Sequence, residues 1–242
     1  MATSPVKDFL LSHLMPEPCY HEFFVNLHFI HVPCLRIVLS KTVGFWILLD
    51  TVLAQLPQVL KIMRKRSAAG LSLTSVLLQL YAASCPVVFC MANSFPLYAW
   101  GERLFTLVQI AVIGFLILHY HGDDLKGLLF LLAYSGIMLL LGSYATAAVV
   151  SMMQASSIVA VIASKLIQAG TNYCNSHTGQ LSSLSVLLVW AGSLALIFVS
   201  LQETGNSLNT LAHILSACLS CVLLAQVLCY RSNNTAMKQK SE

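Results

Sequence analysis

The residues best suited to chemistry stand around one proline. Gln55 and Gln58 enclose Leu56-Pro57 near the end of an apolar run, and a basic cluster that begins at Lys61 follows. A proline inside a helix removes one backbone hydrogen bond, which is expensive at membrane depth. The sequence therefore predicts a helix break whose backbone groups bond to the two glutamine amides. A helix break surrounded by polar side chains is typical of a binding site.

Two polar stripes run along apolar segments. Asp50, Pro57 and Lys61 lie within about 40° of one another around a helix, with Gln58 to one side. A later segment carries a second stripe of similar width, made of Gln154, Lys165, Gln168 and Asn172. Because polar groups exposed to lipid are costly, we expect both stripes to face protein or trapped water.

Asp50 and Lys165 are the two ionisable groups of these stripes, and two interpretations stay open for each. An ionisable group at membrane depth favours a functional site. Each also lies within a few residues of a span end, where its side chain can reach the membrane surface instead. For single glutamines such as Gln79 and Gln109, bonding between helices is the favoured interpretation.

The composition determines which elements position these residues. The chain is 57% hydrophobic and 9% charged, whereas soluble domains carry about 25% charged residues. Apolar runs of about 20 residues, enough to cross a hydrocarbon core about 30 Å thick, recur seven times. They cover residues 42–60, 71–91, 97–119, 125–143, 146–168, 180–201 and 207–230. The pattern predicts an all-α polytopic membrane protein with seven transmembrane helices.

The chain repeats itself at a constant offset. One and the same shift pairs Gln58 with Gln168 and Ser72 with Ser182, and also aligns residues 75–78 with residues 185–188. Two three-helix units joined by an inverting fourth helix would have the same orientation and would enclose a cavity. The expected divisions are an N-terminal segment 1–41, a first repeat 42–120, a linker helix 121–145, a second repeat 146–230 and a tail 231–242. Within the N-terminal segment, the stretch from Phe23 to Leu39 is expected to be an interfacial or luminal helix.

Charge predicts the orientation. Nine of the thirteen Lys and Arg residues lie in the tail, or in or close beside the loops after the first, third and fifth spans. The positive-inside rule then places the C-terminus in the cytosol and the N-terminus in a lumen. Lys238 and Lys240 have the spacing of a dilysine signal that returns membrane proteins to the endoplasmic reticulum.

The sequence shows no pattern typical of a cofactor site or an enzyme active site. The eight cysteines do not have the spacing of a disulfide framework. No metal site, cofactor or nucleic acid is expected, and no acid/base or nucleophile constellation predicts an enzyme.

The residues resemble a known family. Pro57-Gln58, the short basic loop and the stretch Ser67 to Ser72 are similar to the PQ-loop repeat of a seven-helix, three-plus-one-plus-three family. That family includes lysosomal amino-acid exporters and sugar-transporting relatives. In the second unit Ile167 stands where the family has its proline, so only Gln168 of the pair remains. This departure weakens the case for symmetric rocking of two hinged units.

Four further stretches resemble the mannose-P-dolichol utilization defect branch of that family. They are residues 31–35, residues 93–96 followed by 100–102, residues 168–173, with Tyr173 at their end, followed by 175–182, and residues 202–205. The resemblance implies a non-catalytic factor of the endoplasmic-reticulum membrane. Such a factor is needed for mannose-P-dolichol and glucose-P-dolichol to serve as donors in N-glycan and glycosylphosphatidylinositol-anchor assembly. Its implied partners are dolichyl-phosphate sugars, membrane lipids and luminal mannosyl- and glucosyltransferases. The alternative is a small-solute transporter for amino acids or sugars.

Overall fold

The structure is a computed structural model that describes residues 7, 10–97, 100–203 and 207–241. These residues form helices and connecting turns, with no β-strand among them. Side chains are not described for a few of these residues, including 231–241 at the C-terminal end. After a π-helical turn η1 (Leu10–Leu14) come α2 (Glu17–Phe24), α3 (Val32–Leu53), α4 (Leu56–Lys65), α5 (Leu73–Ala92), α6 (Gly101–Tyr120), α7 (Asp124–Tyr144), α8 (Ala147–Cys174), α9 (Ser183–Glu203) and α10 (Ser207–Ser241).

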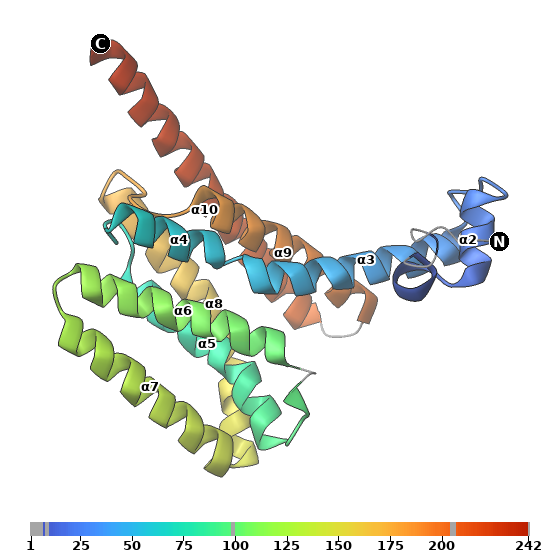
Figure 1. The fold of residues 1–242 in the computed structure, drawn as a ribbon, viewed down its shortest axis with the longest axis horizontal. Coiled ribbons are helices and arrows are strands. Elements are labelled where there is room, and N and C mark those ends of the chain that lie inside the picture. Colours follow the sequence, from blue (N-terminus) through green and yellow to red (C-terminus); the bar gives the residue numbers. More distant parts are fainter. Residues whose placement is uncertain (1–6, 8–9, 98–99, 204–206, 242) are drawn as a thin grey trace.

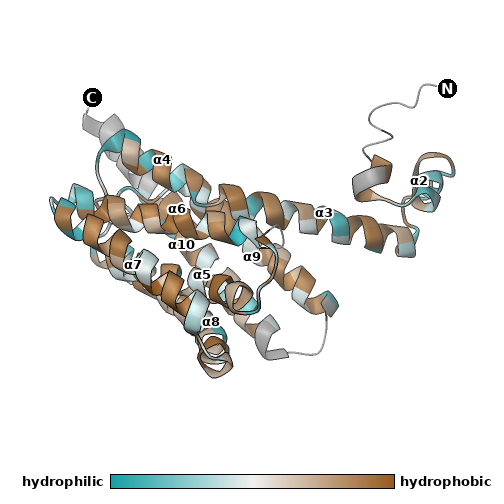
Figure 2. Ribbon diagram, turned by 60° about the horizontal axis from the view of Figure 1, so that its bottom comes forward, coloured by the Kyte–Doolittle hydropathy of each residue, from teal (hydrophilic) through white to brown (hydrophobic). Residues whose placement is uncertain are grey.

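Seven stretches of the described chain are long and apolar enough to cross a membrane, which confirms the predicted class. The first combines α3 and α4 over Val32–Lys65, and the last is the Thr210–Tyr230 part of α10. Brown apolar residues cover these helices along most of their length in Figure 2. The structure is therefore that of a polytopic, all-helical membrane protein.

The N-terminal segment differs from its expected form. A single helix, α3, begins at Val32 and runs without interruption into the first span, so residue 41 is not the end of an element. Pro33 stands in the first turn of α3, where a proline costs no helical hydrogen bond. A disulfide joins Cys19 in α2 to Cys34 in α3, which corrects the expectation that the cysteines form no bridge. Figure 1 shows α2 at the outer end of α3, far from the C-terminus.

The spans pack as two matched sets of contacts. The second helix of the first unit, α5, packs against α8, the first helix of the second unit. Reciprocally, α9 packs against α3 and α4. Both α5 and α9 begin at a serine whose hydroxyl accepts a backbone N–H three residues later, Ser72 from Ser75 and Ser182 from Ser185. These N-caps occupy equivalent positions in the two units, as the repeat predicts.

The fourth span lies at the edge of the bundle. α7 packs against α5 and α6, and Figure 1 shows it on the outside of them. Two glycines allow the close approach, because Gly114 of α6 lies against the Phe130 ring and Gly127 of α7 lies against the Phe115 ring. The largest buried apolar cluster joins α5 and α6 to the neighbouring faces of α7 and α8.

Candidate functional site

The proline break is real, but the glutamines that flank it do not repair it. The interruption covers Ala54 and Gln55, between the end of α3 and the start of α4. The carbonyl of Thr51 accepts a hydrogen bond from Thr106 Oγ1 at 2.5 Å. The carbonyl of Val52 accepts one from Gln109 Nε2 at 2.8 Å. Two side chains of α6 therefore satisfy the backbone groups that the break exposes.

Gln55 and Pro57 occupy the break itself. Gln55 is buried, and its backbone carbonyl accepts the N–H groups of Gln58 and Val59 as α4 begins. Pro57 stands in the first turn of α4, where its missing N–H has no helical partner to lose. The expectation that the Gln55 and Gln58 amides replace the lost helical bonds is wrong.

Gln58 instead bonds to the loop of the other unit. Its Nε2 donates to the carbonyl of Gln180 at 3.1 Å, and its Oε1 accepts the N–H of Ser182 at 2.6 Å. The side chain is 4% exposed. Both ends of the amide are thus used to hold the turn that leads from α8 into α9.

Gln168 makes the equivalent pair of bonds in the opposite direction. Its Nε2 donates to the carbonyl of Gly70 at 3.0 Å, and its Oε1 accepts the N–H of Ser72 at 3.1 Å. Every partner is related to its counterpart by the offset of the repeat, since Gly70 corresponds to Gln180 and Ser72 to Ser182. We call these four bonds the glutamine clasp. The glutamine of each unit therefore hydrogen-bonds to the loop of the other unit.

The two gripped loops also touch each other. The N–H of Gln180 donates to the carbonyl of Ala69 at 2.9 Å. Gly70 and Gly179 both have positive φ, +82° and +49°, a region that favours glycine. A Cβ on Gly179 would overlap the Ala69 carbonyl oxygen. Only glycine at these positions lets the two loops approach so closely.

Other polar residues surround the clasp. Lys61 Nζ donates to the carbonyl of Leu181 at 2.8 Å. Asn172, which is fully buried, accepts from Gln168 Nε2 at 2.9 Å and donates to Gln226 Oε1 of α10 at 3.0 Å. Gln226 Nε2 in turn donates to the Ala169 carbonyl at 3.0 Å. A buried network that is satisfied in this way makes the arrangement of its helices specific.

Lys165 occupies a second polar centre on α8. Its ammonium donates to the backbone carbonyl and hydroxyl of Ser216, at 3.1 and 2.6 Å, and to the hydroxyl of Ser220 at 2.7 Å. Within the described residues no carboxylate lies within 4.0 Å of it. The side chain is half-buried between α8 and α10. Among the described residues, this cation therefore has one carbonyl and two hydroxyl partners and no counter-ion.

Asp50 lies apart from both centres. Its carboxylate faces Gly192 of α9, where a Cβ would overlap Oδ2. Its Oδ1 is buried and accepts no hydrogen bond. Gln154 is half-buried near the start of α8, and Tyr173 is 75% exposed. The structure therefore unites Gln58 and Gln168 with their neighbours at one end of the bundle and leaves these three residues outside that network.

Several functional positions were not found by sequence reasoning. The offset of the repeat, applied to every polar position and not only to the glutamines, would have drawn attention to the loop partners of the clasp. No sequence signal marks Thr106 of α6 or the polar side chains of α10, which look like ordinary polar residues on apolar helices. The predicted bonding of Gln109 between helices is confirmed by its bond to the Val52 carbonyl. The missed residues are Thr106, Gly179, Gln180, Ser216, Ser220 and Gln226.

Two further predictions concern the chain ends and metals. The side chains of Lys238 and Lys240 lie outside the described residues. His119 Nδ1 lies 2.5 Å from Asp124 Oδ1, and this pair is part of no larger cluster. In the part of the chain that the structure describes, no three His, Cys, Asp or Glu side chains are grouped as metal ligands.

Comparison with known proteins agrees with the geometry of the first unit. Residues 39–99 match the family model of the PQ loop repeat. The match begins within α3 and ends before α6, so the matched residues contain the break, Gln58 and the loop at Gly70 that Gln168 contacts. Its partner in the clasp, Gln168, lies outside the matched residues. No solved structure matches the chain.

Proposed function

We propose that this protein is a non-catalytic factor of the endoplasmic-reticulum membrane that binds dolichyl-phosphate sugars. In this role it presents mannose-P-dolichol and glucose-P-dolichol to luminal mannosyl- and glucosyltransferases, or helps the head group cross the bilayer. Lipid-linked oligosaccharide assembly for N-glycans and glycosylphosphatidylinositol-anchor assembly would both depend on it.

The observation that carries the proposal is the lysine centre on α8. A cation at membrane depth is costly unless it is paired. Lys165 has only serine oxygens as partners within the described residues. A phosphodiester would supply the missing negative charge through charge-assisted hydrogen bonds, which are about twice as strong as neutral ones. A phosphate-linked lipid therefore fits this centre better than an uncharged solute.

The asymmetry of the two units supports presentation over rocking transport. The first span is interrupted at Ala54 and Gln55, whereas α8 runs unbroken through the equivalent position at Ile167. A rocking mechanism in which both units hinge alike needs a hinge in each. One break and one continuous helix favour a protein in which one unit is fixed while the other adjusts.

The location in the endoplasmic reticulum is supported by two features. The Cys19–Cys34 disulfide requires an oxidising compartment, which agrees with a luminal N-terminus. In Figure 1 the C-terminal end of α10 leaves the bundle opposite α2, in agreement with termini on opposite sides of the membrane. The lysines at the C-terminus then face the cytosol, where a retrieval signal acts.

The test uses the purified protein in liposomes with a short-chain dolichyl-phosphate mannose analogue. We expect saturable binding that free mannose does not displace and inorganic phosphate displaces weakly. Lys165→Met should weaken binding at least about tenfold. Lys126→Met should not, because Lys126 is an exposed residue in the first turn of α7 that pairs with Asp123. Equal binding by both variants would refute the phosphate role of Lys165. Absence of binding and of transbilayer movement in the unaltered protein would refute a direct role.

A second candidate, a small-solute transporter, is favoured by Asp50. A carboxylate oxygen that is buried without a hydrogen-bond partner suits a group that takes up and releases a proton during transport. This candidate predicts saturable, proton-coupled uptake of a free amino acid or sugar into the same liposomes. Asp50→Asn should remove the coupling. If that variant supports donor use unchanged in cells that lack the protein, proton coupling is unnecessary.

A further inference from the structure

We propose that the loop closed by the Cys19–Cys34 disulfide seats its apolar residues in the lipid of the luminal leaflet. The surface of this loop lies outside the clasp and the lysine centre. The proposal rests on the luminal orientation of the N-terminus and does not depend on which ligand the protein binds. The loop would contact the headgroups and upper acyl chains of the membrane lipids.

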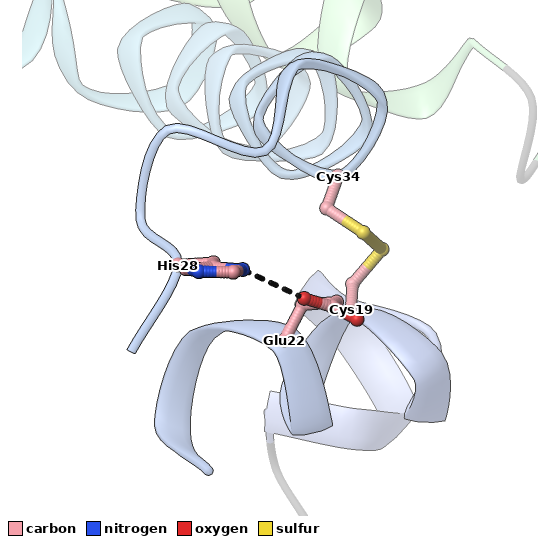
Figure 3. The surroundings of a disulfide bond; sticks show 4 residues. All are labelled: Cys19, Glu22, His28 and Cys34. Atoms are coloured by element: carbon pink, nitrogen blue, oxygen red, sulfur yellow. Dashed lines mark ion pairs between the residues drawn. A yellow bond between two sulfur atoms is a disulfide. The ribbon is translucent and has the colours of Figure 1, made fainter. Parts of the chain in front are cut away.

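The disulfide makes a small folded cap out of the N-terminal segment. Cys19 and Cys34 are buried, together with Met15 and Phe23, and Tyr20 packs against them. Figure 3 shows the bridge joining α2 to the first turn of α3, with His28 and Glu22 facing each other beneath it. The His28 Nδ1 to Glu22 Oε2 distance is 3.6 Å. The connecting loop is therefore held at both ends.

The loop between these fixed ends exposes large apolar side chains. Ile30 is 85% exposed and Leu27 is 66% exposed. The other members of this surface, which we call the apolar loop, are Phe24, Val25, Phe29 and Val32. Exposed apolar side chains this dense mark an interaction surface and not a surface that faces water.

The apolar loop continues the lipid-facing surface of the first span. Below Val32, the exposed residues Leu35, Leu39, Trp46 and Leu49 follow one another at intervals of three, four or seven along α3. These spacings place them on one helical face. That face is exposed all along the span, where only lipid can cover it. The same apolar environment that covers the span is therefore continuous with the loop.

The test asks whether a glycan acceptor in the loop is shielded by the membrane. His28→Ser completes an acceptor sequon with Asn26, at an exposed position. Thr3→Asn combined with Pro5→Thr places a control acceptor near the N-terminus. The luminal transferase modifies only acceptors that stand clear of the bilayer. In full-length protein expressed in cells, we expect the control acceptor to be modified and the loop acceptor to stay unmodified.

A third variant separates membrane shielding from simple rigidity. Phe29→Ser and Ile30→Ser, added to His28→Ser, make the loop polar and should release it from the lipid, so that its acceptor becomes modified. Modification of His28→Ser alone would overturn the proposal, because the loop would then stand in water. An unmodified polar loop would overturn it as well, since the membrane would not be the shield. An unmodified control acceptor would place the N-terminus on the cytosolic side of the membrane, which would also overturn the proposal.

Discussion

The two units hold their first helices in different ways at the proline break and its equivalent position in α8, and in the same way at the loops. In the first unit Thr106 bonds to a carbonyl that the proline break exposes. In the second unit the position equivalent to Thr106 is Ser216, which bonds to the ammonium of Lys165. Thr106 and Ser216 occupy equivalent positions on the third helices of the two units. Thr106 bonds to the interrupted backbone of the first unit, whereas Ser216 bonds to the Lys165 ammonium of the second.

This difference shows which contacts the two units share and which contacts differ between them. The glutamine clasp relates its four bonds by one constant offset, so it belongs to the shared architecture. The break and the lysine occupy equivalent depths without sharing any chemistry. We infer that the loops supply the common structural joint, whereas the break and the lysine centre carry the specific function.

The largest expected effect comes from disturbing the joint where the loops touch. In Gly179→Ala the new Cβ meets the Ala69 carbonyl at a residue with positive φ. We expect the free energy of unfolding to fall by more than about 2 kcal/mol, because strained backbone alone costs roughly 1 to 3 kcal/mol. Thermal unfolding of the purified protein in detergent measures the change.

The matched control for that variant is Gly170→Ala. Gly170 lies within α8, and a Cβ there meets nothing within 4 Å. Replacing a glycine inside a helix by alanine is stabilising by roughly 0.5 to 1 kcal/mol. If both variants unfold at the same temperature, the loops do not depend on their close approach.

The next effect tests whether the clasp is symmetric. Gln58→Leu leaves the N–H of Ser182 without its partner, and Gln168→Leu does the same to Ser72. Each change should cost about 1 to 3 kcal/mol, the penalty for an unsatisfied buried polar group. The two costs should be similar, and the double variant should cost less than their sum because the loops support each other. Gln79→Leu serves as a control outside the clasp.

Sequence reasoning found both clasp glutamines but assigned Gln58 the wrong partners. The repeat at a constant offset and the seven apolar runs could be read directly, because span length and periodicity are local properties. Which group bonds to a freed carbonyl is not local. Gln109 lies more than 50 positions from the break, and only the packing of α6 against α3 brings it there. Only the bounds of the N-terminal helix differ from those expected, because the chain leaves the helical form between α2 and α3, and α3 begins at Val32 and continues into the first span.

A smaller effect tests the repair of the break by α6. Gln109→Leu removes the donor to the Val52 carbonyl and should cost about 1 kcal/mol. In a Pro57→Ala background the backbone regains an N–H at position 57, and the helix can close across the break. The cost of Gln109→Leu should then fall to near zero in a double-mutant cycle of unfolding free energies. Equal costs in both backgrounds would contradict a role for Gln109 in repairing the break.

The smallest effect on stability is expected at the centre proposed to carry the function. Lys165→Met removes a cation that has no counter-ion in the described residues, and replacing buried charges by apolar groups of similar size is often neutral or stabilising. We expect its unfolding free energy to stay within about 1 kcal/mol of the unaltered protein, while binding of the dolichyl-phosphate mannose analogue falls at least about tenfold, or 1.4 kcal/mol. Lys61→Met should lose stability instead, because Lys61 bonds to the Leu181 carbonyl beside the clasp. If Lys165→Met loses as much stability as Lys61→Met and still binds the lipid, both lysines have only a structural role. The distinction between structural loops and a functional lysine centre would then be wrong.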